Sequence, residues 1–303
     1  MKTLFLLIKR NTKLYFKDKG LFFSSLITPM ILLVLYSTFL KNVFTDSFQS
    51  ALANANLTLS DKLIANVVNG EIVSSILAVS TVTVAFCSNM LIIKDKNNDT
   101  LRDFTVSPVK PWVLALGYYL ASLLSDLIVS FIATGLCFVY LSITGWYLSA
   151  LDVVLILVDV FTLCMFGTIL SSIVNFFLTS DSQATAISTI VSCGYGFISG
   201  AYMPLSSFSK TLRNALMFLP GTYGTNIIKN HTLSSAFEKI QNDAHVPEAA
   251  IENFRDYFDC NLSFFDNQVG KETPYLVFYL CIFALILIYL LLNIIKTRKA
   301  LKN

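Results

Sequence analysis

Three acidic residues stand inside long apolar runs of the sequence, where a carboxylate is unusual. Asp126 lies near the middle of one run, Asp159 lies seven residues into the next, and Glu71 lies near the end of an earlier run. A carboxylate at the centre of a bilayer costs about 2.5–3.5 kcal/mol on insertion scales, so each residue needs a partner or a purpose. Apart from Lys41 near the end of the first run, the apolar runs offer no Lys or Arg as an ion-pair partner.

Asp126 and Asp159 therefore allow two interpretations. Either residue could face a wet cavity or a subunit seam and contact a cationic or polar group of a transported molecule. Alternatively, each could hydrogen-bond to polar side chains on a neighbouring helix. Four such side chains are available in the apolar runs: Asn89, Ser130, Thr162 and Asn175.

Signatures of enzymatic chemistry are absent from the sequence. No segment matches the phosphate-binding pattern G-x-x-x-x-G-K-[ST], and Gly194, Gly196 and Gly200 lack the spacing and the preceding strand of a dinucleotide site. The two histidines, His231 and His245, fall outside the apolar runs, so we expect no metal site in the membrane. We expect neither a catalytic centre nor a cofactor in this chain.

The composition indicates an integral membrane protein. The 303 residues are 55% hydrophobic and 14% charged, with a mean hydropathy of +0.66. The formal net charge of +3 is too small to suggest a nucleic-acid partner. Most of the six cysteines lie in apolar stretches and predict no disulfide framework.

Six segments are long and apolar enough to cross a bilayer, which takes about 20 residues. They cover residues 21–43, 67–93, 113–141, 152–178, 184–203 and 274–295. Because lipid leaves no backbone group unpaired, we expect an all-α bundle of six transmembrane helices forming a single domain, 1–303.

Basic residues predict the orientation of these spans. Of the 22 Lys and Arg, six lie in residues 1–20, four in 94–111 and four in 296–303. Basic residues concentrate on the cytoplasmic side, so we expect a multi-pass protein of the cell membrane with both termini in the cytoplasm.

Three segments between or beside the spans have distinct patterns. Residues 1–20 predict a basic amphipathic helix in the membrane interface. Residues 204–230 predict a short amphipathic helix that enters the outer membrane face and returns, stopped by Pro220 and Gly221; a surface helix of an outer loop is the alternative. Residues 231–273 hold eight acidic residues and predict an external cap that shapes an exit path, binds a partner or packs as a lid.

The order of these features resembles the type-2 permeases of ATP-binding cassette (ABC) transporters. The most specific matches are Ser199, Gly200, Pro204, Leu205 and Ser206, and the block Leu219, Pro220, Gly221, Thr222 and Tyr223. A second match is the loop IIKDKNNDTLRDFTVSPVKPWVLALGYYL, and Pro29 in the first span also fits the family.

The resemblance implies roles for several segments. The cytosolic loop 94–111 would contain a coupling helix that seats in the ATPase, formed by Asp99, Thr100, Leu101, Arg102, Asp103, Phe104, Thr105 and Val106. The helix from Leu4 to Lys17 would be the connecting helix beside it. ATP and Mg would bind the partner ATPase and not this chain, and a second permease subunit, identical or different, would complete the assembly.

The residues of the coupling segment also support a helix by themselves. Asp99 and Thr100 suit a helix start, Asp103 adds an acid to the first turn, and Pro108 favours a stop. The alternative is an ordinary solvated loop whose Lys and Arg mark the cytoplasmic side.

We therefore expect the membrane subunit of an exporter that moves an amphipathic or hydrophobic substrate outward, in a lipid bilayer and driven by a separate ATPase. One alternative is a secondary transporter or channel that uses Asp126 and Asp159 as a relay, although the sequence shows no internal repeat. Another is a non-transporting receptor or immunity protein whose cap captures an external ligand.

Overall fold

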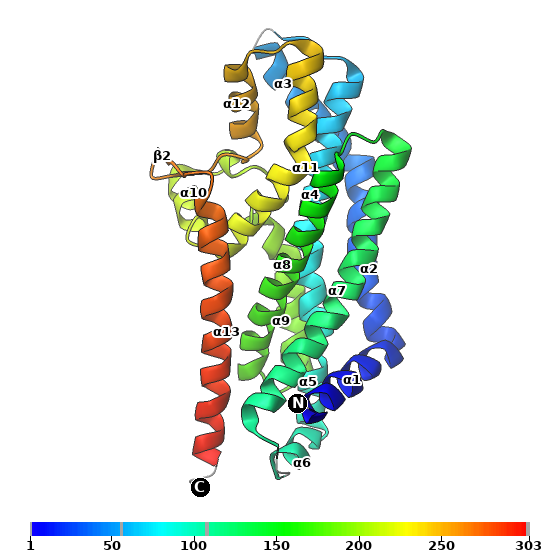
Figure 1. Ribbon diagram of the computed structural model, residues 1–303, viewed down its shortest axis with the longest axis vertical. Coiled ribbons are helices and arrows are strands. Elements are labelled where there is room, and N and C mark those ends of the chain that lie inside the picture. Colours follow the sequence, from blue (N-terminus) through cyan, green and yellow to red (C-terminus); the bar gives the residue numbers. More distant parts are fainter. Residues whose placement is uncertain (1, 55–56, 107–108, 301–303) are drawn as a thin grey trace.

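The computed structural model describes residues 2–54, 57–106 and 109–300, and for residues 54, 102, 105, 106 and 296–300 it describes the backbone alone. Long, roughly parallel helices form an elongated bundle (Figure 1). The N-terminal helix, the short helix α6 and the C-terminal end of α13 lie at one end of the bundle. We call this the inner end, and the opposite end the outer end.

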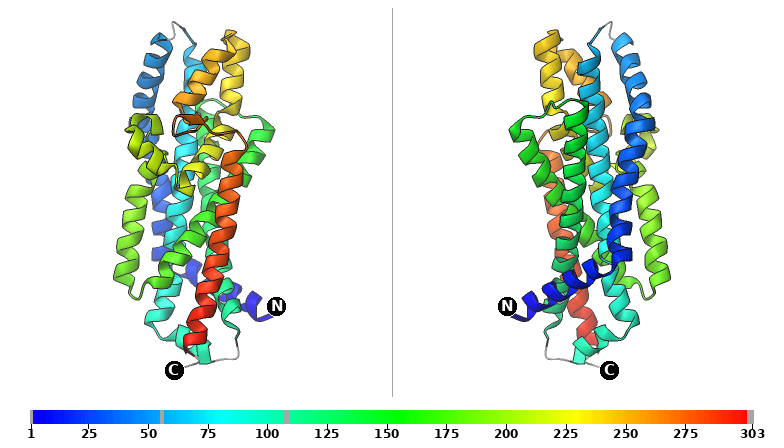
Figure 2. Two further views of the ribbon diagram at one scale, coloured as in Figure 1. Left: turned by 90° about the vertical axis from the view of Figure 1, so that its left-hand side faces the viewer. Right: turned by 90° about the vertical axis from the view of Figure 1, so that its right-hand side faces the viewer.

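The N-terminal helix α1 (Lys2–Lys17) lies across the inner end of the bundle, as Figure 2 shows. Its inward face buries Leu7, Asn11 and Tyr15, and the helix packs on α7 and α2. Its lysines line the opposite, exposed face. This division of apolar and basic faces is typical of a helix that lies in a membrane interface.

The first long helix is a composite of three segments. Helix α2 (Lys19–Leu35) begins at Asp18, whose carboxylate accepts a hydrogen bond from the amide of Leu21. It continues through a π-helical turn, η1 (Tyr36–Leu40), into α3 (Lys41–Asn54). The helix therefore extends well beyond the predicted span 21–43, because polar residues prolong it above the apolar run.

Helix α4 (Asp61–Ser88) is the centre of the bundle. It packs on α2, α3, α7, α8, α9 and α11. In its most apolar stretch 78% of the residues are buried inside the protein, against 17% in the first and last long helices. A break at Asn89 and Met90 separates α4 from α5 (Leu91–Asn97), and α6 (Thr100–Val106) follows.

Helices α7 (Pro111–Thr144), α8 (Ala150–Phe177) and α9 (Asp181–Ile198) follow in antiparallel order. A capping box fixes the start of α8, since Ser149 and Asp152 exchange hydrogen bonds with each other's backbone amides. The last helix, α13 (Thr273–Ala300), stands along α7, α8 and α11.

Five of the predicted spans correspond to helices long and apolar enough to cross a membrane. The stretches that meet this criterion are Lys19–Ala53, Asp61–Asn97, Pro111–Thr144, Ala150–Phe177 and Thr273–Ile295. Helix α9, predicted as the span 184–203, is not among them because its 18 residues include many hydroxyl and amide side chains. The sixth crossing stays a prediction.

The outer end is built from shorter elements. After α9 come a 3₁₀ turn, η2 (Leu205–Ser207), and α10 (Lys210–Leu216); α11 (Pro220–Ala244) and α12 (Glu248–Tyr257) follow. A two-stranded antiparallel ribbon, β1 (Ser263–Phe264) and β2 (Asn267–Gln268), precedes α13.

Two sequence predictions for this region are wrong in detail. Pro220 and Gly221 do not stop a helix; they begin α11, because proline at the first helical position gives up no hydrogen bond. The boundary between a segment 204–230 and a cap 231–273 is also wrong, since α11 runs through it without a break. Whether α10 enters the membrane stays a prediction.

Candidate functional site

Arg10 is the central contact of the inner end. Its guanidinium binds Asp95 of α5 through two nitrogens, Nη1 at 2.7 Å and Nη2 at 3.3 Å from the carboxylate oxygens. The hydroxyl of Tyr118 in α7 donates to the same carboxylate at 2.5 Å. The guanidinium also lies 5.2 Å from the ring centroid of Phe104 in α6. One side chain of α1 therefore holds α5 and α6 in place.

Two lysines of α5 attach it to other helices. Lys94 Nζ lies 2.5 Å from the carboxylate of Asp18, the cap of α2, and this ammonium holds the pKa of Asp18 below its usual value. Lys96 Nζ donates to the carbonyls of Asn175, Phe176 and Leu178 at 2.6–3.3 Å. A cation bound to the final carbonyls of α8 is favoured by the negative end of the helix dipole.

The predicted coupling segment forms helix α6, which begins at Thr100 and ends at Val106. Asp99 precedes it in the left-handed conformation, with φ of 55°, and Asp103 is exposed in its first turn. The side chains of Arg102, Thr105 and Val106, together with all of Ser107 and the predicted stop Pro108, lie outside the described residues. The helix itself is as predicted, but nothing in this structure tests its contact with an ATPase.

We define the inner platform as α1, α5 and α6 with the contacts of Arg10, Lys94 and Lys96. These contacts join the platform to the start of α2, to α7 and to the end of α8. A force applied to α6 would therefore reach several long helices at once. The inner platform can therefore transmit movement from α6 to the long helices without any catalytic step.

The break between α4 and α5 is stabilised by hydrogen bonds around Asn89. Its side-chain amide donates to the hydroxyls of Ser171 and Ser172 in α8 at 3.0 and 2.8 Å, and it accepts from Ser122 of α7 at 3.0 Å. Asn175 donates to its backbone carbonyl at 3.0 Å. The break is thus held inside the bundle by four side-chain hydrogen bonds, while the Asn89 amide still donates to the carbonyl of Ala85.

The carboxylate of Asp126 is surrounded by hydroxyl groups of α7 and α8. It is fully buried, and it accepts hydrogen bonds from Ser130, one turn later in α7, at 3.1 Å, and from Thr168 of α8 at 3.2 Å. The bond from Thr168 fits the interpretation with polar partners on a neighbouring helix, whereas Ser130 lies on the same helix as Asp126. A second role in contact with a transported molecule remains untested.

Asp159 has a partner that the sequence analysis did not consider. Its carboxylate lies 2.5 Å from Nδ1 of His231 in α11, whose Nε2 lies 3.1 Å from the hydroxyl of Tyr275 at the start of α13. The prediction of Ser, Thr or Asn partners for Asp159 is therefore wrong. The error arose because α11 returns His231 to the bundle, whereas the sequence analysis placed it in an external cap. Asp126 and Asp159 belong to separate clusters, and no bond links them in the described part of the chain.

A buried ion pair joins α4 to α11. Lys229 Nζ lies 2.7 Å from Oε1 of Glu71, both side chains are 0% exposed, and the angle of the contact departs from that of a directed hydrogen bond. Lys229 also donates to the carbonyl of Phe258 at 3.4 Å. Lys229 lies outside the apolar runs predicted as spans, so the lack of a basic partner inside those runs did not exclude this ion pair. The lysine comes from a segment that is too polar to be a span.

Asp259, which follows α12, binds the first residue of η2. Its carboxylate accepts a hydrogen bond from the amide of Leu205 at 2.6 Å. Burial raises the pKa of Asp259 to about 6, although Lys229 and the Leu205 amide both favour the charged form. The carbonyl of Asp259 accepts from Asn226 at 2.6 Å, so α11 holds the same loop from the other side.

The proline and glycine residues predicted for the re-entrant segment mark three turns. Gly200 has φ of 73°, and a Cβ there would stand 3.0 Å from the Leu205 side chain. Pro204 precedes η2, Pro220 begins α11, and a Cβ at Gly221 would stand 2.9 Å from the hydroxyl of Tyr195. These residues let the chain fold back closely between α9 and α11.

Sequence reasoning missed several of these residues. Arg10, Asp95 and Lys96 looked like ordinary charges of the cytoplasmic side, and Asn89 was considered only as a partner for a carboxylate. Lys229 and His231 lie at the end of the predicted segment 204–230 and just after it, where no sequence signal indicated contact with the long helices. Within the described residues, no cluster of three or more His, Cys, Asp or Glu could hold a metal ion.

A comparison with family models gives a match over most of the chain. The matching family is described as ABC-2 type transporter, and the match covers residues 2–230. It includes the inner platform, the break at Asn89 and the turn before α11. No match was found among curated proteins.

Proposed function

Because this chain belongs to the ABC-2 type transporter family and is a multi-pass permease subunit, we propose that it is the membrane subunit of an ABC exporter. ATP hydrolysis would take place on a separate nucleotide-binding subunit, with ATP and Mg bound there. The observation that carries this proposal is the inner platform, which connects an exposed helix to the most buried helix of the bundle.

The proposed mechanism begins at α6. A nucleotide-binding subunit that closes on ATP would press on α6, and Phe104 and Arg10 would pass the movement to Asp95 in α5. Helix α5 leads into α4 through the break at Asn89. Since α4 packs on six other helices, a tilt of α4 would rearrange the packing of the bundle between two states.

Exposed apolar side chains form a surface of this chain that suits contact with lipid or with another subunit. Helices α2 and α13 expose many large apolar residues along their length, among them Phe23, Ile31, Leu280, Phe283 and Leu291. We propose that part of this surface contacts lipid and that the rest contacts a second permease subunit. The pathway between two such subunits would suit a hydrophobic or amphipathic substrate moved outward across the cell membrane, with both termini cytoplasmic.

A reconstituted system tests the proposal. The chain is co-purified with a candidate nucleotide-binding subunit from the same organism, placed in liposomes, and assayed for ATP hydrolysis and for export of a panel of amphipathic compounds. Asp103→Arg in α6 should lower ATP-driven export, because it reverses the charge of an exposed residue at the proposed contact. Glu248→Arg, an exposed acid in the first turn of α12 at the outer end, is the matched control and should keep export unchanged.

Two results would contradict the proposal. The first is failure of any nucleotide-binding subunit to co-purify or to stimulate transport. The second is transport that follows a proton gradient and ignores ATP, which would favour a secondary transporter instead.

A further inference from the structure

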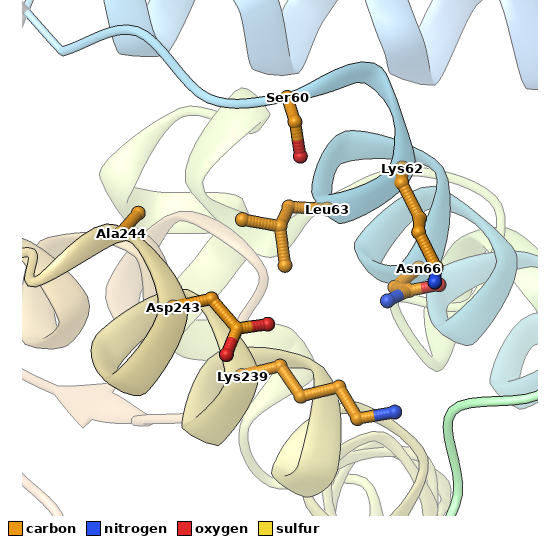
Figure 3. Close-up of a pocket in the computed structure, with 7 residues that line it drawn as sticks. All are labelled: Ser60, Lys62, Leu63, Asn66, Lys239, Asp243 and Ala244. Atoms are coloured by element: carbon orange, nitrogen blue, oxygen red, sulfur yellow. The ribbon is translucent and has the colours of Figure 1, made fainter.

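A pocket of about 320 Å³ lies at the outer end, between the first turns of α4 and the last turns of α11. Figure 3 shows the residues that line it: Ser60, Lys62, Leu63, Asn66, Lys239, Asp243 and Ala244. Its volume is at the small end of the range for ligand sites. A share of about 30 Å³ for each water makes it equivalent to about ten waters.

The polar groups of this pocket have no protein partners. Asn66 is 3% exposed, no described residue hydrogen-bonds to its side chain, and it lines the pocket. Lys62 and Asp243 are exposed, Lys239 is half-buried, and none of the three forms an ion pair with a described residue. The Asn66 amide is the deeply placed polar group of the pocket, and the three charges around it are free to contact a ligand.

The distribution of charge indicates which ligand would fit. The lining carries two ammonium groups and one carboxylate. In Figure 3 the ends of Lys62 and Asn66 lie close together to the right of Leu63. The Asp243 carboxylate lies below Leu63, and the Lys239 side chain extends away from it to the right. The N-terminal end of the 28-residue helix α4, with Ser60 as its cap, adds positive potential on the side of Lys62.

We propose that this pocket is a binding site for the phosphate or carboxylate group of a small ligand at the outer face. Lys62, Lys239 and the Asn66 amide donate to the anionic oxygens, as charged and amide donors do in other anion sites. Leu63 and Ala244 contact the apolar part of the ligand. Asp243 accepts from a donor at its other end and disfavours ligands that carry a second anionic group there.

The proposal is independent of the transport function. The pocket is at the end of the molecule away from α1, α6 and the C-terminal end of α13, and none of its residues belongs to the inner platform (Figure 1). Binding of an anion would join α4 to α11 at a point where the protein itself supplies no bond. The site would therefore act on the same pair of helices that the Glu71–Lys229 ion pair connects.

Binding is tested with two probes, inorganic phosphate and butyrate, which carries a single carboxylate. The full chain is purified in nanodiscs of a neutral lipid, and each probe is titrated by calorimetry at low ionic strength, because salt screens exposed charges. We expect one probe molecule to bind per chain. A parallel titration in nanodiscs of an anionic lipid identifies the source of the anionic group: phosphate binding that persists there indicates a soluble ligand, and phosphate binding that lipid abolishes indicates a headgroup at the same site.

Three variants and a control identify the site. Lys62→Met and Lys239→Met should each weaken phosphate binding about tenfold, which equals about 1.4 kcal/mol. Asp243→Asn should tighten phosphate binding severalfold, because it removes a like charge. Lys271→Met removes a lysine that is 81% exposed at the same end of the molecule, and it should leave binding unchanged.

The sign of the Asp243→Asn effect separates binding from a general loss of structure, since damage to the fold would weaken binding. Elution of each variant as a single species on size exclusion confirms that it is folded. Absence of binding by either probe to the unaltered chain would overturn the proposal. So would equal affinities of the unaltered chain and both lysine variants.

Discussion

The ion pair between Glu71 and Lys229 allows a quantitative test of how the outer region is attached to the bundle. The two charged atoms are 2.7 Å apart and neither side chain is exposed to solvent. Lys229→Met removes one charge and leaves the Glu71 carboxylate buried without compensation. Loss of one partner from a buried pair costs about 3–5 kcal/mol, so we expect this variant to be strongly destabilised.

The double variant Glu71→Met/Lys229→Met should behave differently. Replacing both charges by apolar side chains of similar size removes the attraction and the desolvation cost together, and in other proteins this change is neutral or stabilising by about 1–4 kcal/mol. We therefore expect the double variant to be more stable than either single variant. The interaction energy of this cycle is large because the two residues share one contact.

The assay is thermal unfolding of the three variants and the unaltered chain in one detergent at one protein concentration. The expected loss for each single variant is on the order of 10 °C, with the double variant within a few degrees of the unaltered chain. Additive losses in the double variant would refute the reasoning. So would a single variant as stable as the unaltered chain, which would mean that water reaches the pair.

Three further predictions concern other parts of the molecule. Arg10→Met should lower the ratio of export to ATP hydrolysis, both measured on the same liposomes, because it removes the two-nitrogen contact with Asp95. It should also lower thermal stability, because the buried Asp95 carboxylate loses its cation. Burial raises the pKa of Asp259 from 3.8 to about 6, so the protonated carboxyl favours the folded state. The contribution of Asp259 to the free energy of unfolding therefore falls by about 3 kcal/mol as pH rises from 3.8 through 6. Asp259→Asn should flatten this part of the pH profile of unfolding, and an unchanged profile would contradict the assignment. Gly200→Ala should lower the free energy of unfolding by about 1–2 kcal/mol, because Gly200 has a positive φ and the Leu205 side chain lies close to it. The control Gly135→Ala has open space around the new methyl group and should leave stability unchanged. Thermal unfolding of the two variants compares them.

Hydrophobic patterning was sufficient to predict the long helices, because the cost of unpaired backbone in lipid leaves few other structures. Five predicted spans have helices of sufficient length and apolarity, and residues 100–106 form the predicted short helix. The ends were less accurate. Polar residues such as those of Lys41–Asn54 continue a helix as readily as apolar ones, so hydropathy does not mark where it stops.

The contacts of the site were harder to predict for a different reason. The contact between Asp126 and Ser130 is local, because Ser130 lies one turn away on the same helix. The partners of Asp159 and Glu71 come from α11, 72 and 158 residues later in the chain. A prediction of those pairs requires knowing that Pro220 starts a helix that passes beside α4 and α8. Local sequence does not contain that information.

The π-helical turn at Tyr36–Leu40 has a consequence for the alignment of the first long helix. One extra residue in a helical turn rotates everything beyond it by about 100°. That rotation is what keeps Tyr36 and the later residues Phe44, Phe48 and Leu52 on one inward-facing stripe, where Phe48 meets Phe254 and Phe258. Deleting a single residue from this turn would turn Phe44, Phe48 and Leu52 away from the protein interior. The contacts of Phe48 with Phe254 and Phe258 would then be lost, although the composition of the helix would hardly change.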